Sequence, residues 1–504
     1  MVMRGKKTMK RLIVAMGIAV IVFARSAAAQ APSDIGRLKE LIESQQKQIQ
    51  LQQTELDSQR QQLESFRKQL AEIEKSRTNP PAGTSGPAAT APALAPPAPP
   101  PPPGGTVPGN SPSVAPRQVL NQDPNAAARL DNAPVDPEME GFIAIPGTTS
   151  RFRFGGFAKL DFIHDFQPAG EADSLITSTI PVDPKPNAQN TAVSIRPTRF
   201  SMDFRRPTEK GDLRIYYEND FYASNGAAGY HLRHAYGQIW NLLAGYSFSA
   251  LVDVDSMPDT LDFEGPGSMV YVMQPQVRYT LPLDTAKKHT LAFSLERGTS
   301  DILTQVPTTQ VTVTPTSPWP DGVIRYRYEG ARGHFQAGAV FRSVGGYVGD
   351  TAQRHTFAWG VSLAGAAQVG ERDNFLYQLN AGKGMGRYVE DVQGLAPDVG
   401  IDRHGHLAAL PLYSGFLGYQ HYWSETLRST LTYGYLKVDS KEYRFTTDFY
   451  RSDYGAVNLI WNPRGTSFNF GVEYLYGDQV LRTGRSGHAN RVQISIQYDL
   501  LKLK

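Results

Sequence analysis

The chain has 504 residues, with 51 lysine and arginine residues against 48 aspartate and glutamate residues, and it contains no cysteine. The lack of cysteine excludes a disulfide framework, a thiolate metal site and a cysteine nucleophile. The length leaves room for several domains. The mean hydropathy of −0.37 is polar.

Residues 1–29 have the pattern of an export signal. A basic stretch from Arg4 to Arg11 precedes an apolar run at residues 12–23, and Ala27-Ala28-Ala29 offers an A-x-A cleavage site. The run is too short for a helix that stays in a bilayer. We therefore predict a signal peptide over residues 1–29. No later stretch is long and apolar enough for a spanning helix, so any membrane residence must come from strands.

Residues 30–78 carry a seven-residue repeat. Apolar side chains recur without a slip at Ile35, Ile42, Ile49, Leu56, Leu63 and Leu70. The second core position is filled by Leu38, Gln45, Gln52, Gln59, Phe66 and Ile73. The repeat predicts a periplasmic coiled coil of roughly 60 Å, at about 1.5 Å per residue. A single amphipathic helix lying on another surface is the alternative.

Residues 79–140 form a predicted linker. Residues 79–116 are dominated by proline, alanine, glycine, serine and threonine, and residues 117–140 are polar and irregular. The proline run at residues 96–103 is typical of a semi-rigid polyproline spacer, which reaches on the order of 100 Å at about 3 Å per residue. Two functions stay open for this segment: a stalk that reaches toward peptidoglycan in the periplasm, and an inert tether.

Residues 141–504 show short stretches in which apolar and polar residues alternate. In residues 491–498, Val492, Ile494 and Ile496 alternate with arginine, glutamine and serine. Because successive side chains of a strand point to opposite faces, each stretch has one apolar face and one polar face. The pattern predicts 16 strands near residues 151–166, 192–205, 212–221, 230–238, 240–250, 271–280, 289–297, 322–329, 333–342, 356–366, 374–382, 413–423, 426–438, 453–462, 466–476 and 491–498.

The length of each connection depends on whether it follows an odd-numbered or an even-numbered strand. Those after even strands are short and rich in turn formers, such as residues 206–211, whereas those after odd strands run to about thirty residues, such as 383–412. An outer-membrane barrel has short turns on one side and longer loops on the other, whereas a soluble sandwich has no such requirement. We predict an all-β fold, a 16-stranded antiparallel transmembrane β-barrel with a water-filled lumen, both barrel ends periplasmic, and the N-terminal segment in the periplasm.

Arginine is placed repeatedly on the wet face of these strands. A charge facing lipid costs up to a few kcal/mol at mid-bilayer, so the lumen is the economical position. Guanidinium groups match carboxylates and phosphates, and arginines that line a pore favour anions. The alternative is that they pair with lumen acids and hold the wall open. The predicted pore-lining, substrate-binding candidates are Arg199, Arg205, Arg214, Arg278, Arg325, Arg327, Arg342, Arg428 and Arg491.

The third long loop, residues 251–270, carries acids and no lysine or arginine. If this loop folds inward, its acids face the arginines of the wall and create a transverse field, which orients dipolar solutes. An external acidic loop that binds divalent cations beside lipopolysaccharide is the alternative. The constriction candidates are Asp253, Asp255, Asp259, Asp262 and Glu264.

The sequence gives no positive sign of an enzyme. The histidines are scattered, and His404 with His406 lacks a third metal ligand at a diagnostic spacing. Glycine-rich pieces such as residues 382–386 do not lead from a strand into a helix, so they are not phosphate cradles. We predict no catalytic residue, no metal site and no cofactor.

Several stretches resemble the DcaP-type family of trimeric outer-membrane porins. They are residues 232–237 (LRHAYG), 243–245 (LAG), 257–260 (MPDT), 265–266 (GP), 275–280 (PQVRYT), 471–474 (GVEY) and 491–495 (RVQIS). The N-terminal extension also resembles that of the family. The chain departs from the family pattern at residues 245–248 and in its last residues, 500–504, where an aromatic end is usual. The resemblance implies a trimeric porin for dicarboxylates and related anions.

We therefore expect an outer-membrane channel that passes small, dicarboxylate-like anions by passive diffusion. The expected partners are a second and third copy of the chain, outer-membrane lipid and lipopolysaccharide, small anionic solutes and peptidoglycan, with no nucleic acid. One alternative is a sugar-specific channel of the sucrose-porin type, which needs a trail of aromatic side chains in the lumen. Another is an envelope-tethering protein that the barrel anchors.

Overall fold

A computed structural model of the chain describes residues 141–500, apart from residues 185–187, 210, 224–225, 303–312, 350–352, 402–405 and 440–447. The predicted signal peptide, coiled coil and linker lie outside the described residues. Among the described residues, no helix has the length and apolarity needed to cross a bilayer.

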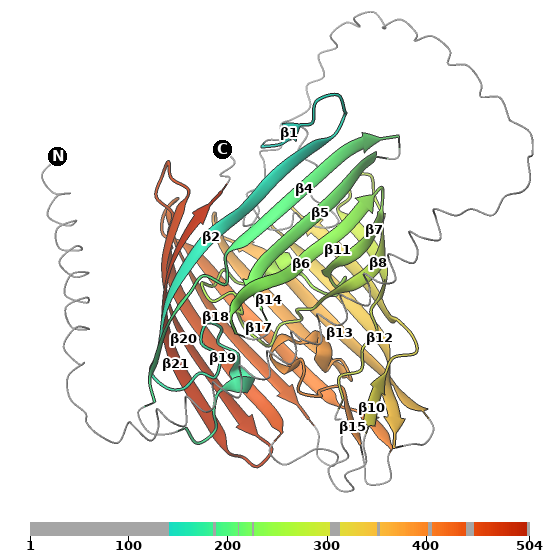
Figure 1. Cartoon of the computed structure of the whole chain (residues 1–504), viewed down its shortest axis with the longest axis vertical. Coiled ribbons are helices and arrows are strands. Elements are labelled where there is room, and N and C mark those ends of the chain that lie inside the picture. The colour runs from blue at the N-terminus through green and yellow to red at the C-terminus, as the bar shows by residue number, and fades with distance from the viewer. Residues whose placement is uncertain are drawn as a thin grey trace, which may run out of the picture. The chain divides into compact units, whose positions relative to one another are not determined.

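The described residues form a closed antiparallel barrel of 16 strands (Figure 1). The first half of the wall comprises β2 (Arg151–Asp165), β3 (Asn190–Ser194) with β4 (Arg199–Thr208), β5 (Gly211–Tyr222), β6 (Ala228–Ile239), β7 (Leu242–Phe248), β8 (Met273–Pro282), β9 (His289–Glu296) and β10 (Val313–Thr316) with β11 (Asp321–Gly330). The second half comprises β12 (Gly333–Val348), β13 (Gln353–Val369), β14 (Asp373–Lys383), β17 (Pro411–Tyr422), β18 (Leu427–Val438), β19 (Phe449–Trp461), β20 (Phe468–Leu481) and β21 (Ser486–Asp499).

Each barrel strand pairs with its neighbours in the sequence, and β21 pairs with β2 to close the wall. The pieces β3 and β4 both pair with β2 and together make one barrel strand. The pieces β10 and β11 do the same beside β12. The short β1 (Ile143–Ala144) pairs with the start of β2. The predicted strand number and order are therefore confirmed.

The alternation of side chains explains which face of the wall is which. In β20, Tyr474 is 45% exposed on the outside, whereas the adjacent Glu473 is 1% exposed on the inside. The same contrast separates Val277 from Arg278 in β8. Charged side chains thus avoid the lipid face, where they are costly, and the strands present an apolar outer surface.

Two features of the strands differ from the prediction. The second barrel strand is not continuous, because residues 195–198 interrupt it and Pro197 has no N–H to donate to a ladder. Several strands also extend further toward the long loops. For example, β12 reaches Val348 rather than 342, because the polar and glycine-rich residues there hide the alternation while the backbone pairing continues.

The long connections contain short elements of their own. These are η2 (Thr177–Thr179), η3 (Val254–Ser256), η4 (Gly386–Tyr388), η5 (Glu390–Val392) and the hairpin of β15 (Val399–Ile401) and β16 (Leu407–Ala409). We name residues 166–189 loop 1, residues 249–272 loop 3 and residues 384–410 loop 6. Figure 1 shows the coiled part of loop 6 within the outline of the strands.

Candidate functional site

Loop 3 runs along the inner wall of the barrel. The carbonyl oxygen of Leu251 accepts a hydrogen bond from Gln336 of β12 at 3.2 Å. The carbonyl oxygen of Leu261 accepts from Lys159 of β2 at 2.8 Å and from Gln493 of β21 at 3.0 Å. Between these points the loop contacts the inward faces of strands β14 and β17–β20. Loop 3 therefore lies inside the barrel, and the alternative of an external loop is wrong.

Four of the five predicted loop acids meet predicted wall arginines directly. Arg327 donates to Asp253 at 2.8 Å and to Asp255 at 2.5 Å. Arg428 donates to Asp259 at 2.5 Å. Because each acid touches its arginine, these charges are neutralised in place and do not face each other across an open gap. The pairs hold loop 3 against the wall.

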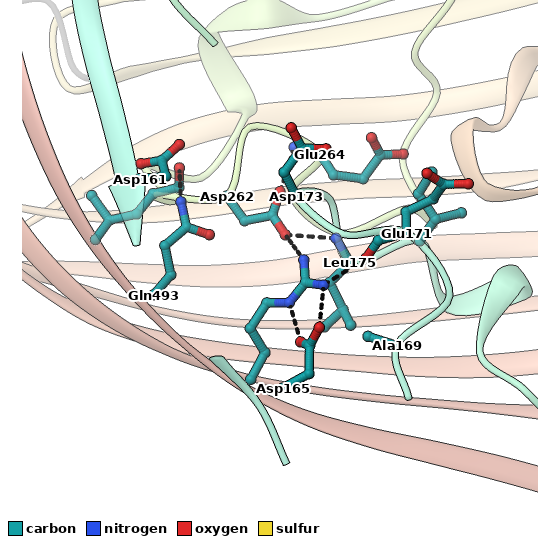
Figure 2. Close-up of polar contacts among 12 residues, drawn as sticks. Asp161, Asp165, Ala169, Glu171, Asp173, Leu175, Asp262, Glu264 and Gln493 are labelled. Carbon is teal, nitrogen blue, oxygen red and sulfur yellow. Dashed lines mark hydrogen bonds and ion pairs between the residues drawn. The ribbon is translucent and has the colours of Figure 1, made fainter. Parts of the chain in front are cut away.

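Arg491 completes this set at the closing seam of the barrel. Its guanidinium donates to Asp165 at 2.6 Å and lies 3.8 Å from Asp262, with no exposed surface (Figure 2). Asp262 also accepts a hydrogen bond from the backbone N–H of Leu175 in loop 1 at 2.7 Å. One buried arginine thus joins the wall to loop 3, and through Asp262 to loop 1.

The root of loop 3 carries a dense charge network. Burial alone would raise the pKa of Asp253, but His334 and Arg327 outweigh it and lower that pKa. Asp253, Asp255 and His334 are a group of possible metal ligands, with one ligand atom of each lying within 4.8 Å of the others. The guanidinium of Arg327 already donates to both carboxylates. The positive charge at this group of ligands is therefore that of Arg327 itself.

The remaining predicted arginines also lie on the inner side, and most have a wall partner. Arg205 and Arg214 share Asp203, at 3.1 and 3.0 Å. Arg342 lies between Asp321 at 3.0 Å and Asp398 of loop 6 at 2.8 Å. Arg278 donates to Gln276 and to the carbonyl oxygen of Phe248, and Arg325 is likewise buried.

Arg199 differs from the rest of the predicted set. Its side chain is partly exposed, at 13%, and its nearest acid, Glu218, is 3.6 Å away. The guanidinium stacks over the rings of Phe157 and Phe263, at 5.3 and 5.5 Å from their centroids. Within the part of the chain that the structure describes, it makes no hydrogen bond. A stacked guanidinium with free N–H groups is suited to receive a carboxylate.

The prediction missed Arg233, which lies close to this position. The pairing of β5 with β6 skips one residue at Arg233, which is a β-bulge. Both Arg233 and His234 therefore point inward, although strict alternation allows only one of them to do so. Arg233 donates to Glu218 at 2.9 Å and to the hydroxyl of Tyr271 in loop 3 at 2.9 Å. Alternation alone cannot reveal an inward side chain at a bulge.

Loop 6 packs directly on loop 3, which the sequence did not predict. The N–H of Glu390 donates to the carbonyl oxygen of Met269 at 3.2 Å, and that of Asp391 donates to Gly267 at 3.0 Å. Buried apolar side chains of both loops, including Val270 and Val389, form a common core. The two loops therefore form one inward unit.

Loop 1 joins the same unit through Asp391. The backbone N–H of Thr177 donates to the Asp391 carboxylate at 3.1 Å, and the Thr177 hydroxyl donates to the same oxygen. The hydroxyl of Ser178 donates to the Asp391 carbonyl oxygen at 2.5 Å. Three loops from distant parts of the sequence thus meet at one aspartate.

Carboxyl groups gather where the three loops meet. Figure 2 shows Glu171, Asp262 and Glu264 in the same region. Burial raises the pKa of Asp391 to about 7, although the hydrogen bonds from Thr177 oppose it. Burial and the neighbouring Asp391 raise the pKa of Glu390 to about 8, and burial raises that of Glu264. This junction holds protons more tightly than isolated carboxyl groups do.

Comparison with known proteins places the fold. The model of the DcaP outer membrane protein family matches residues 114–500. The chain belongs to this family. It is an outer-membrane β-barrel channel, and the family and fold are generally non-enzymatic. No curated protein matches the chain.

One solved structure supports the barrel fold, and two others are more distantly similar. The crystal structure of the outer membrane channel DcaP of Acinetobacter baumannii has a TM-score of 0.62 at 20% identity, covering 71% of this chain and 99% of that one. An anion-selective porin from Comamonas acidovorans has a TM-score of 0.43 at 10% identity, covering 70% and 100%. OmpF of Salmonella typhi, in complex with daunomycin, has a TM-score of 0.45 at 10% identity, covering 71% and 100%.

Proposed function

We propose that this DcaP-family barrel gives passive diffusion of small anionic, dicarboxylate-like solutes through its lumen. The observation that carries the proposal is Arg199, a partly exposed guanidinium that is held flat by Phe157 and Phe263 and makes no hydrogen bond in the described part of the chain. Arg233 is not available in the same way, because it donates to Glu218, to Asp220 and to the hydroxyl of Tyr271. A carboxylate that passes this face of the lumen meets planar donors in a fixed orientation.

The paired arginines have a different role in this proposal. Arg327, Arg428 and Arg491 neutralise the acids of loop 3 and hold the loop inside the barrel. The loop then narrows the lumen and brings Phe263 against Arg199. Anion preference therefore rests on Arg199, whose guanidinium keeps donors available, while the paired set fixes the shape of the passage. The proposed assembly is a homotrimer in outer-membrane lipid with lipopolysaccharide.

The proposal is tested by reversal potentials of the full-length protein in planar bilayers under a salt gradient. The wild-type channel is expected to prefer anions. One unit charge at about 4 Å is worth about 1 kcal/mol in water, so Arg199→Gln should lower the ratio of anion to cation permeability about fivefold. Arg464→Gln is the matched control, because Arg464 is 77% exposed and pairs with Glu425 at the surface. A cation-selective wild type would exclude the anion proposal and leave the channel.

A further inference from the structure

A cluster of arginines lies on β2, β4 and β5, at the end of the barrel where the connections are short. The cross-strand pairing places Arg151, Arg205 and Arg214 in one row, because Arg205 is opposite each of the other two. Arg153 and Asp203 face each other in the next row. Like charges that are directly opposite destabilise a sheet. A row of three arginines therefore weakens the wall, which indicates that the row has a role other than holding the wall together.

The cluster faces the lumen. Asp203 and Arg214 are buried, whereas Met202 and Ile215, their neighbours in the sequence, are exposed on the outside of the barrel. Successive side chains of a strand point to opposite faces, so the odd-numbered residues of β4 and the even-numbered residues of β5 point inward here. Arg153 follows the same rule on β2, since the next residue, Phe154, is exposed on the outside.

Three arginines of the cluster share a single carboxylate. Arg205 and Arg214 lie 3.1 and 3.0 Å from Asp203, and Arg153 lies 3.9 Å from it. Within the part of the chain that the structure describes, no other carboxylate is within ion-pair distance of these three groups. The ratio is reversed at Arg327, where one guanidinium contacts three carboxylates. Three guanidinium groups beside one carboxylate leave a surplus of two positive charges.

The cluster also keeps hydrogen-bond donors. Arg205 and Arg214 each donate to Asp203 through Nε and Nη2, and no described residue accepts from Nη1 of either. The distance of 3.9 Å from Arg153 to Asp203 is too long for a hydrogen bond. The guanidinium of Arg153 makes no hydrogen bond to any described residue, and its side chain is 18% exposed. A solute in the lumen therefore finds donors on all three side chains.

Aromatic rings fix the orientation of these donors. Phe142 precedes β1, and the pairing of β1 with the start of β2 brings it beside Arg153. The guanidinium groups of Arg153 and Arg205 lie 4.9 and 5.3 Å from the centroid of the Phe142 ring. The guanidinium of Arg214 lies 4.7 Å from the centroid of the Tyr216 ring. Stacking on a ring leaves the N–H groups at the edge of a guanidinium free, in a planar arrangement that matches carboxylates.

We propose that Arg153, Arg205 and Arg214 form a dicarboxylate-binding site at the short-connection end of the lumen. One carboxylate of the solute accepts from Arg153, and the other accepts from Nη1 of Arg205 or Arg214. A dianion balances the surplus of two charges, whereas a monoanion balances half of it. The inference rests on the proposed function for its solute class. The site itself is separate, because Arg199 and Arg205 are six positions apart on β4, or about 20 Å at about 3.4 Å per residue.

The test uses a reporter thiol, because the chain has no cysteine of its own. Ala144→Cys introduces the thiol at an exposed residue of β1, opposite Arg151. The full-length protein in detergent is treated with an anionic and a cationic methanethiosulfonate of similar size, and both rates are normalised to those of a free thiol. Each surplus positive charge at about 8 Å should raise the ratio of the anionic to the cationic rate about fivefold. Arg153→Gln should therefore lower this ratio about fivefold.

Binding itself is measured as protection of the same thiol. At matched ionic strength, succinate should slow the anionic reagent about threefold more than acetate does, because the second carboxylate meets the second surplus charge. Phe142→Ala keeps every charge and releases the two stacked guanidinium groups. It should keep the ratio of the two rates and lose the advantage of succinate over acetate. Arg206→Gln is the matched control, because Arg206 follows Arg205 on β4 and is exposed on the other face, so both results should stay unchanged.

The outcomes separate this site from the proposed function. Equal rates of the two reagents, or equal protection by succinate and acetate, would overturn the inference, and both comparisons need only the Ala144→Cys protein, so they hold even if Arg153→Gln does not fold. Arg199→Gln in the same protein should lower anion permeability and keep the protection by succinate. A cation-selective channel that succinate still protects would remove the proposed function and leave the site. An anion-selective channel in which succinate protects no better than acetate would remove the site alone.

Discussion

Replacing Arg327 by methionine is the sharpest test of how loop 3 is held. Methionine keeps an unbranched apolar stem and removes the charge. Asp253 and Asp255 then stay buried without the guanidinium that donates to both of them. Removing one partner of a buried ion pair costs about 3–5 kcal/mol. The barrel strands keep their own hydrogen bonds, so we expect the cost to fall on the contact between loop 3 and the wall.

The structure indicates how far the loop can move. Loop 3 remains attached by the bond between Arg428 and Asp259 and by the bonds of Lys159 to Leu261. Its root near Asp253 is therefore the part that detaches. A penalty of this size raises the population of a detached root by about two to three orders of magnitude. In single-channel recordings, open-channel current noise should increase, and limited proteolysis of the folded protein should cut near residue 255.

The effect of Arg327→Met should depend on pH. In the wild type, His334 and Arg327 hold the pKa of Asp253 below its usual value. Their stabilisation is thus present above the unfolded pKa and is lost only as the pH falls through the folded one. Without Arg327, only His334 opposes the effect of burial on Asp253, so this pKa moves upward. The variant should therefore be noisiest at high pH and quieter as acidification protonates Asp253.

The control is Arg464→Met, which removes an exposed arginine from the short connection between β19 and β20. Exposed ion pairs contribute about 0–1 kcal/mol, so its recordings should match those of the wild type. If Arg327→Met also showed wild-type noise and the wild-type cleavage rate at neutral and high pH, the buried ion pairs would not be what holds loop 3 in place.

Two further predictions concern the other loops and the N-terminal segment. Gly267→Ala should separate loop 6 from loop 3 and raise single-channel conductance, because a Cβ at Gly267 would overlap the Asp391 carboxylate. Gly455→Ala is the control, since a Cβ there meets open space and should leave the conductance unchanged. Equal conductance of the two variants would contradict the packing of loop 6 on loop 3. Deleting residues 30–140, the predicted coiled coil and linker, should leave conductance unchanged, since β2 and β21 close the barrel without those residues; a folded barrel without conductance would contradict this expectation, and a lost envelope phenotype with normal conductance would indicate a tethering role.

The alternation in the sequence predicted the strands because the membrane imposes the same demand at every position. Lipid outside and water inside force an apolar and a polar face, as at Tyr474 and Glu473. The prediction was incomplete where another rule acts locally. Pro197 lies in the interruption of the second barrel strand, and the bulge at Arg233 turns two consecutive side chains inward. The hydrophobic periodicity of the sequence reveals neither an interrupted strand nor a β-bulge.

The candidate site was predictable only in part for a different reason. The sequence indicated that arginines line the inner face and that loop 3 carries acids, and the structure brings Arg327, Arg428 and Arg491 to those acids. Loop 6 was not expected to take part, because its contacts with loops 1 and 3 join residues that are far apart in the chain, such as Thr177 and Asp391. Loop packing of this kind has no periodicity that a single sequence reveals.

Whether a charged side chain in the lumen has a partner decides its role: paired residues set the shape of the passage, and residues with free donors set its ion selectivity. An arginine that is fully paired, such as Arg342, has no donors left for a solute, and its neutral pair projects little field. A charge without a close partner projects its field into the passage and keeps its hydrogen-bonding capacity. Arg199 on the wall keeps this capacity, because its guanidinium makes no hydrogen bond among the described residues, although Glu218 lies 3.6 Å away. Changing a paired residue should therefore alter how open and how steady the channel is, whereas changing Arg199 should alter which ions it prefers.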